Sequence, residues 1–154
     1  MKGRVMPAPI RIGIVGSRRR DSHEDYSAVV NVFADLVEEL GIPFEEAGKY
    51  IIIVSGGCPK GGDRFAEIIA DTIGAKKEIY YPDKSQLPAN PQRWDFARIN
   101  YARNTLVANG CDILIACVSE DRKGGTEDTI KKFTKSCGLP FESVMQARGF
   151  LYLA

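Results

Sequence analysis

The sequence has few of the residues that metal sites need and none of the long apolar runs that membrane spans need. It contains one histidine and four cysteines, and no two cysteines share a Cys-x-x-Cys spacing. This disfavours zinc ligation, and we expect no metal and no cofactor. No apolar run approaches the roughly 20 residues that cross a bilayer. The first nine residues lack the apolar segment of a secretory signal, so we expect a cytoplasmic protein with no membrane association.

The sequence also lacks a strong charge of either sign. Its 21 lysines and arginines nearly balance its 20 aspartates and glutamates, which gives a formal net charge of +1. Because a broad polyanion-binding surface needs a basic excess, we expect nucleic acid to be disfavoured as a partner, although a local basic pocket stays possible. With 154 residues, 44% of them hydrophobic, the chain predicts a tail at 1–9 and one globular domain at 10–154.

Short apolar runs alternate with amphipathic segments along the chain. We expect strands at 10–15, 50–54, 78–81 and 111–118, helices at 25–40, 63–73, 92–109 and from 126 to 137, and a last strand somewhere in 139–154. Such alternation is typical of βαβ units. We therefore predict an α/β fold with a single doubly wound, mainly parallel, Rossmann-like sheet and helices on both faces. Trp94, Asp95 and Phe96 are candidates to line the side of the site where a base binds, but for the two aromatics we favour packing in the core.

Three glycine-rich loops each follow a predicted strand, at the edge where the carboxyl ends of a parallel sheet meet and ligands bind. Backbone N–H groups at a helix N-terminus bind phosphate at such places. Gly61 and Gly62 directly precede a helix, so we expect their N–H groups to face an anion, while Asp63 can cap that helix. The candidate phosphate- or nucleotide-binding residues of these loops are Gly16, Ser17, Arg18, Ser55, Gly56, Gly57, Gly61, Gly62, Asp63, Gly124, Gly125 and Thr126.

Arginines near these loops are candidate side-chain ligands of phosphate. For Arg18, directly after the first strand, we weigh a phosphate contact equally against solvent exposure, whereas Arg19 and Arg20 are expected to be solvated. Arg103 precedes Asn104 in a helix segment that reads as apolar nearly all round. A guanidinium there needs an anion, either a protein carboxylate or a ligand, so we add Arg103 and Asn104 to the candidate site.

Together these motifs resemble the SLOG superfamily, a Rossmann-like group that includes the Lonely Guy phosphoribohydrolases (often labelled lysine decarboxylases), the DprA recombination mediators and the YspA-like proteins. The resemblance spans about 10–138. It is carried by Gly-Ser-Arg at 16–18, Ser-Gly-Gly at 55–57, Gly-Asp-Arg at 62–64, Arg103-Asn104 and Gly-Gly-Thr at 124–126. The resemblance implies a nucleotide-like small molecule bound at the glycine loops and a homo-oligomer.

Three functions stay open. A nucleotide-binding or sensing module needs only donors aimed at phosphate, and we place it first. The alternative is a nucleoside-monophosphate phosphoribohydrolase, whose catalytic residues by resemblance would be Arg103 and Asp128, although Thr129 occupies the position of the family's glutamate. DNA recombination mediation comes last, because the sequence shows no stripe of aromatic and basic residues suited to single strands.

Overall fold

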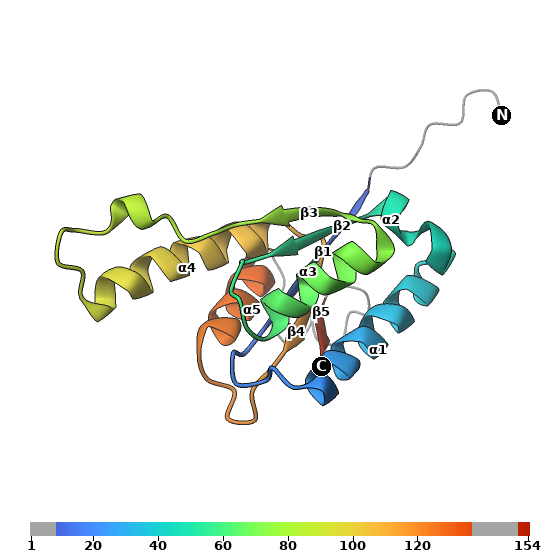
Figure 1. The fold of residues 1–154 in the computed structure, drawn as a ribbon, viewed down its shortest axis with the longest axis horizontal. Helices are drawn as coiled ribbons and strands as arrows, with labels where there is room; N and C mark the ends of the chain where they lie inside the picture. The colour runs from blue at the N-terminus through green and yellow to red at the C-terminus, as the bar shows by residue number, and fades with distance from the viewer. Residues whose placement is uncertain (1–8, 137–150) are drawn as a thin grey trace, which may run out of the picture.

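The computed structural model describes residues 9–136 and 151–154, whose strands form one sheet flanked by helices (Figure 1). The strands are β1 (Ile10–Gly16), β2 (Ile51–Ser55), β3 (Lys76–Ile79), β4 (Ile113–Cys117) and β5 (Leu151–Leu153). The helices are α1 (His23–Glu39), α2 (Ala47–Tyr50), α3 (Gly62–Ile73), α4 (Arg93–Asn109) and α5 (Gly125–Ser136), with short 3-10 turns at Phe44–Glu46 and Lys84–Gln86.

The five strands lie in the order β3-β2-β1-β4-β5, and every neighbouring pair is parallel. The chain builds outward from β1 through β2 to β3, then returns to place β4 on the other side of β1. This reversal is the topological switch point of a doubly wound sheet, and it lies between β1 and β4. The predicted Rossmann-like α/β fold class is therefore confirmed.

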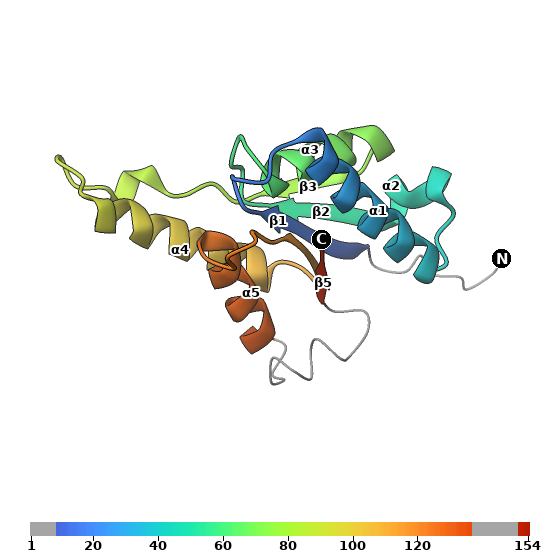
Figure 2. The ribbon, with the colours of Figure 1, turned by 90° about the horizontal axis from the view of Figure 1, so that it is seen from below.

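Each face of the sheet carries its own apolar core. Figure 2 shows α1 and α3 on one face and α4 and α5 on the other. Because alternate side chains of a strand point to opposite faces, Ile12 and Ile14 pack beneath α1 and α3, and Val15 packs with Val107 and Phe133 on the second face. Both faces of the central strands are buried, which is the reason that their sequences are nearly continuous apolar runs.

Local capping fixes the ends of the helices that surround the site. The Ser22 side chain accepts the N–H of Asp25 at 3.1 Å, and the Asp25 carboxylate accepts the N–H of Ser22 at 3.2 Å, which is a reciprocal capping box at the start of α1. At the start of α4 the Asp95 carboxylate accepts the N–H of Gln92 at 2.8 Å, and the Asp95 N–H donates to the Gln92 carbonyl at 3.0 Å. Gly74 ends α3 in the left-handed conformation, with φ of 69°.

Two details of the predicted elements are wrong. The third strand was expected at 78–81 but runs from Lys76 to Ile79. In its register with β2, Lys76 pairs with Ile52 and Ile79 pairs with Ser55. As an edge strand it tolerates exposed lysines, which broke the apolar pattern. The short helical segment at 44–50 was not predicted.

The last expected strand is present as β5, parallel to β4. The expected end of the last helix, near position 137, lies outside the described residues, as does the tail at 1–8. No helix within 9–136 and 151–154 is long and apolar enough to cross a membrane.

Candidate functional site

A cavity of about 350 Å³ opens at the carboxyl ends of the strands, beside the switch point between β1 and β4. Segments that are far apart in the sequence form it: the end of β1, the loop after β2, the loop after β4 with the start of α5, and the middle of α4. Its lining residues are Val15, Gly16, Ser17, Arg18, Arg19, Gly56, Cys58, Asp63, Asn100, Tyr101, Arg103, Asn104, Val107, Lys123, Gly124, Gly125, Thr126 and Thr129. All three glycine loops therefore contribute to one cavity.

The three arginines of the loop after β1, Arg18, Arg19 and Arg20, differ in the contacts that they make. The N–H of Ser17 donates to the carbonyl of Cys117 at 3.0 Å, which joins the end of β1 to the end of β4. Arg18 lines the cavity and is exposed, and within the described part of the chain it makes no hydrogen bond or ion pair. Arg19 donates to both carboxylate oxygens of Asp121, at 2.8 and 2.7 Å. This ion pair joins the loop after β1 to the loop after β4.

Arg20 is not the solvated residue that we expected. Its guanidinium is half-buried and bonds the Asp25 carboxylate at 2.8 Å. It also donates to the carbonyls of Val118 and Ala154, at 2.9 and 2.6 Å. Arg20 therefore connects the start of α1 with the ends of β4 and β5, and its task is structural.

Two glycines of the second loop are required by packing and do not reach the cavity. A Cβ on Gly62 would lie 2.2 Å from the carbonyl carbon of Val15, so α3 can approach β1 this closely only with glycine there. Gly61 has φ of 75°, and its N–H donates to the Asp21 carboxylate at 2.7 Å. That hydrogen bond, with Arg64 beside it, lowers the pKa of Asp21. The anion that the Gly61 N–H meets is therefore a carboxylate of the protein, so this N–H is not available to a ligand.

The rest of the second loop surrounds a buried carboxylate. Gly61, not Asp63, is the N-cap of α3, so the predicted capping role of Asp63 is wrong. The Asp63 side chain instead turns into the loop, where it accepts the N–H of Cys58 at 3.1 Å and lines the cavity. It is 7% exposed, and burial raises the pKa of its carboxyl, against the lowering effects of the Cys58 N–H and of nearby Arg103.

Two predicted residues of this loop stay outside the lining. Ser55 is buried, and its hydroxyl lies within hydrogen-bonding distance of the Asp63 carbonyl and the Gly57 N–H, at 3.4 Å each. Gly57 has φ of 74° and lies against the ring of Tyr81, where a Cβ would come within 2.5 Å of that ring. Both residues shape the loop rather than face the cavity.

Arg103 and Asn104 connect the second loop to the third. The Arg103 guanidinium donates to the carbonyl of Gly56 and, from Nε, to the side-chain oxygen of Asn104 at 3.0 Å. The Asn104 amide donates to the carbonyl of Gly125 at 3.3 Å. Arg103 also lies near the Asp63 carboxyl and acts to lower its pKa, but the structure shows no ion pair between these two residues.

The third loop presents the start of α5 to the cavity. Gly124, with φ of 113°, turns the chain, and α5 begins at Gly125. Space beside Gly125 is open, since a Cβ there would meet nothing closer than the Asn104 amide nitrogen at 3.7 Å. Lys123 and Thr126 complete this side of the lining. The N-terminal end of a helix carries a positive partial charge, so this wall favours an anion.

Asp128 does not line the cavity. Its carboxylate accepts the Asn104 amide at 3.1 Å and forms an ion pair with Lys132 at 2.9 Å. Thr129, one residue further along α5, reaches the lining instead. Asp63 is thus the single carboxylate among the lining residues that the structure describes.

Sequence reasoning misplaced two aromatics and left eight lining residues out of the candidate site: Val15, Arg19, Cys58, Asn100, Tyr101, Val107, Lys123 and Thr129. Trp94 is 68% exposed and Phe96 is 44% exposed, so neither packs in the core. Both lie in the half of α4 that extends beyond the sheet as an arm (Figure 1). The sequence contained one signal that could have found Asn100. Positions 96, 100, 103 and 107 have the spacing of a single helix face, and Arg103 was already a candidate.

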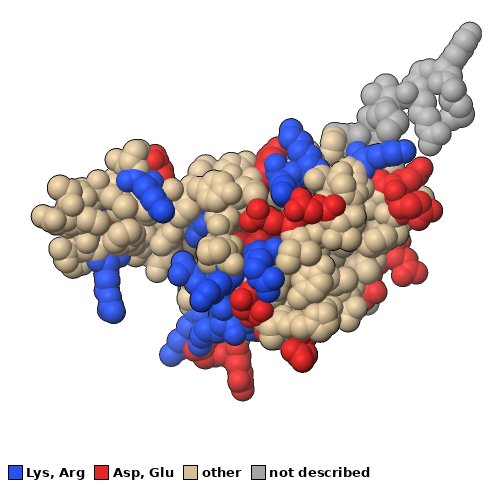
Figure 3. All heavy atoms as spheres, viewed as in Figure 1, with Lys and Arg blue, Asp and Glu red and all other residues tan. Residues whose placement is uncertain are grey.

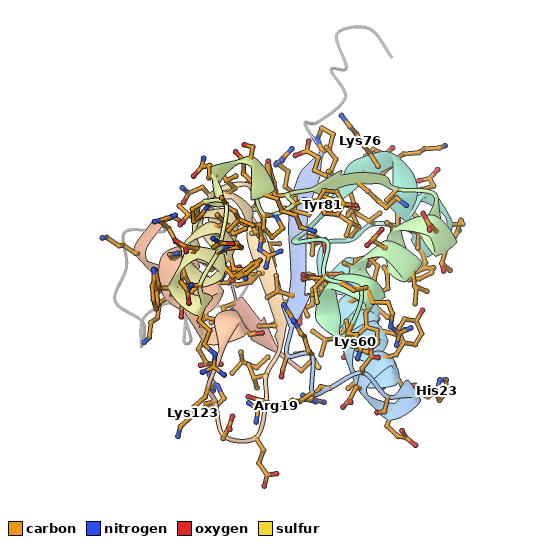
Figure 4. The ribbon with its side chains drawn as sticks, turned by 60° about the vertical axis from the view of Figure 1, so that its left-hand side comes forward. Arg19, His23, Lys60, Lys76, Tyr81 and Lys123 are labelled. Carbon is orange, nitrogen blue, oxygen red and sulfur yellow. The ribbon has the colours of Figure 1, made fainter. Side chains whose placement is uncertain are left out.

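Basic side chains gather around the rim of the cavity. Figure 4 shows Arg19, Lys60 and Lys123, from the three different loops, along the same end of the sheet. In Figure 3 lysine and arginine side chains cluster where the arm joins the body, while much of the arm is uncharged. A net charge near zero thus coexists with a locally basic rim.

No model of a known protein family matches this sequence, and no curated protein sequence matches it. Among solved structures, the chain is similar to DNA processing protein A from Helicobacter pylori, a structure described for its mode of single-stranded DNA binding. The identity is 18% and the TM-score 0.55, over 84% of this chain and 63% of that one. At this identity the similarity shows a shared fold.

The same similarity corrects our view of partners. We expected nucleic acid to be disfavoured because the net charge is near zero, but a protein with this fold binds single-stranded DNA. The expectation is wrong, because binding depends on the charge around a site and not on the total.

Proposed function

We propose that this protein binds the phosphate of a nucleotide unit in the cavity at the switch point. The observation that carries the proposal is that three loops meet at one cavity of about 350 Å³. The exposed side chains of Arg18 and Lys123 and the N-terminus of α5 lie at the same cavity. Pockets of this size and position in doubly wound sheets are the usual sites of small ligands. The resemblance to the SLOG superfamily is consistent with the same chemistry.

The wall formed by Arg18, Lys123 and the first turn of α5 is the best place for the phosphate. Arg18 has no partner among the described residues, so its guanidinium can form a two-point contact with phosphate at no cost to an existing ion pair. Gly125 leaves the backbone accessible. The partial positive charge at the start of α5 acts in the same direction.

Two other lining residues, Asp63 and Tyr101, suit the sugar and the base. Asp63 can accept a hydrogen bond from a sugar hydroxyl, and Tyr101, which is 50% exposed, offers a ring at the cavity edge. Lys132 lies over that ring at 5.5 Å from its centroid. A base that packs on Tyr101 would therefore meet a ring already held in place.

Phosphoribohydrolase activity has less support than binding. Its proposed carboxylate, Asp128, is outside the lining and already paired with Lys132. A carboxylate that stabilises a cationic sugar must lie beside the sugar. Free base released from nucleoside monophosphates, lost in the Asp63→Asn variant and kept in Asp128→Asn, would restore the enzyme hypothesis with a different acid.

Titration calorimetry with a nucleoside monophosphate, a nucleoside and a short single-stranded oligonucleotide tests the proposal. We expect the phosphorylated ligands to bind and the nucleoside to bind at least about 10-fold more weakly, since charge-assisted hydrogen bonds to phosphate are lost. The Arg18→Ala variant should weaken binding by a similar factor. Lys49→Ala is the control, because Lys49 is an exposed basic residue of α2 outside the cavity lining.

Either of two results would contradict the proposal. One is equal affinity for the nucleoside and its monophosphate. The other is equal loss of affinity in the Arg18→Ala and Lys49→Ala variants. The two phosphorylated ligands distinguish a free nucleotide from a nucleotide unit within a strand.

A further inference from the structure

The face of α4 that lines the cavity continues outward beyond the cavity itself. Arg103 and Val107 line its inner part, and Asn100 lies one turn nearer the helix start. Positions 96, 100, 103 and 107 are spaced by four, three and four residues, so their side chains share a face, and position 93 lies one turn beyond. Along this face the residues change from buried at Val107 to 44% exposed at Phe96. We call the segment Arg93–Phe96–Asn100 the α4 track.

The outer part of the α4 track lies beyond the reach of a ligand that only fills the cavity. Phe96 is seven residues from Arg103, which at 1.5 Å per residue is about 10 Å along the helix axis. Figures 1 and 2 both show this half of α4 projecting from the body, away from the sheet. Contact with Phe96 and Arg93 thus requires a ligand with more than one unit.

Although much of the arm is uncharged, the exposed charged side chains in the first two turns of α4 are arginines, which favours a polyanion. Arg93 and Arg98 are exposed, whereas Asp95 is buried. The Asp95 carboxylate is occupied by the N–H of Gln92, at 2.8 Å, and by Arg98, at 3.2 Å. The first two turns of α4 therefore expose arginines and the ring of Phe96 to solvent, whereas the carboxylate of Asp95 is buried. Aromatic rings next to arginines bind the unpaired bases and phosphates of single strands.

We propose that the α4 track binds the next nucleotide of a single strand whose phosphate occupies the cavity, with a base on Phe96 and a phosphate on Arg93. This inference rests on the proposed function and goes further, because it makes the ligand a strand and not a single nucleotide. It also assigns binding roles to Phe96 and Arg93, which contact no other part of the candidate site.

Titration of thymidine monophosphate and of a 5′-phosphorylated thymidine tetranucleotide into the full chain and three variants tests the inference. We expect the Phe96→Ala variant to lose affinity for the tetranucleotide by about 5-fold or more, the effect of one lost base stack, and to keep its affinity for the mononucleotide. Arg93→Ala should reduce the dependence of log K on log salt by about 0.7, the value for one phosphate of a single strand.

Trp94→Ala is the matched control. Trp94 is another exposed aromatic on the same arm, but it lies two residues from Phe96, about 200° around the helix, on a different face. All three variants change exposed side chains, so their unfolding curves should match that of the parent.

Several results would overturn the inference. They are a tetranucleotide that binds no tighter than the mononucleotide, equal losses in Phe96→Ala and Trp94→Ala, or a duplex that binds as tightly as the single strand. Concentration-dependent self-association in sedimentation, abolished by Phe96→Ala, would assign the α4 track to a second copy of the chain instead. If the protein binds neither ligand, the proposed function fails as well, and the mononucleotide titration separates these two failures.

Discussion

Gly62 and Gly125 are both glycines, but their surroundings require or allow glycine for different physical reasons. Gly62 lets the backbone of α3 approach that of β1, and a Cβ would lie 2.2 Å from a main-chain carbon. Gly125 has open space beside it, in ordinary helical backbone at the start of α5. One glycine therefore serves the fold, and the other leaves a helix N-terminus accessible.

The two glycines give opposite expectations for alanine variants. Gly62→Ala should lower the free energy of unfolding by about 2 kcal/mol or more, because a methyl group cannot fit between two backbones. Gly125→Ala should stay within about 0.5 kcal/mol of the parent but weaken mononucleotide binding several-fold, because its methyl group covers the amides of α5. Urea unfolding and titration calorimetry measure both effects. A stable Gly62→Ala protein would contradict the packing argument.

Asp63 should make stability depend on pH. Burial raises the pKa of its carboxyl in the folded protein, so the unfolded chain loses this proton first as the pH rises above about 3.9. The free energy of unfolding therefore falls as the pH rises from the unfolded pKa to the folded pKa of Asp63, and it stays lowered at higher pH. The Asp63→Asn variant cannot ionise and can still accept the Cys58 N–H. We expect its stability relative to the parent to increase as the pH rises from about 3.9 toward the raised pKa of Asp63 in the folded protein.

Urea unfolding of both proteins at several pH values in that range measures the difference. Asp128→Asn is the control, since Asp128 lies near the same cavity without a buried carboxyl. A difference between parent and Asp63→Asn that is constant with pH would show that Asp63 does not ionise at a raised pKa.

At the scale of elements, the loop after β1 is held by Arg20. Its guanidinium joins the first turn of α1 to carbonyls at the ends of β4 and β5. We expect Arg20→Ala to lower the free energy of unfolding by about 1 to 3 kcal/mol, because an ion pair is lost and two carbonyls lose a charged donor. Arg18→Ala, two residues earlier, should change it by less than about 0.5 kcal/mol.

Unfolding in urea, with ligand absent, compares the two arginine variants directly. Equal stability of Arg18→Ala and Arg20→Ala would mean that the contacts of Arg20 contribute nothing net. A larger effect of Arg18→Ala would indicate that Arg18 has a structural partner, which would also remove it from the proposed phosphate site.

The helix α4 is the element that local pattern described least well. Its inner half is buried at Val107 and Ala108, while Trp94, Phe96 and Tyr101 are at least 44% exposed. Because α4 is longer than the sheet it covers, its first turns have no layer to pack against. We assigned Trp94 and Phe96 to the core because the sequence contains no signal that shows where the sheet ends.

At the scale of the molecule, the site exists because crossovers bring three loops to one edge. The loops at 16–19, 56–63 and 123–126 are distant in sequence and adjacent in space. A ligand that binds the folded state and contacts all of them should suppress their local opening together. We expect a saturating mononucleotide to slow amide hydrogen exchange at 56–58 and at 124–127 in parallel, and to leave the far end of α1, at 36–40, unchanged. Protection of one loop without the other would mean that the ligand does not bridge them.

The sequence by itself determined the alternation of strands and helices, the parallel α/β class and the loops that meet at the ligand-binding edge. These follow from hydrophobic periodicity, from glycines and from the rule that crossovers are right-handed, all of which can be read locally. The candidate residues Gly16, Ser17, Arg18, Gly56, Arg103, Asn104, Gly124, Gly125 and Thr126 all line the cavity, and whether they bind a ligand is still a prediction.

Tertiary structure decided what each group in those loops faces. It turned Asp63 from a helix cap into a buried carboxylate, gave the Gly61 N–H to Asp21, made Arg20 structural and left Phe96 in solvent. Each outcome depends on a segment far away in the sequence, or on where the sheet ends. Periodicity and turn chemistry report on a few neighbouring residues, so the direction of a polar group becomes defined only when distant backbones come together.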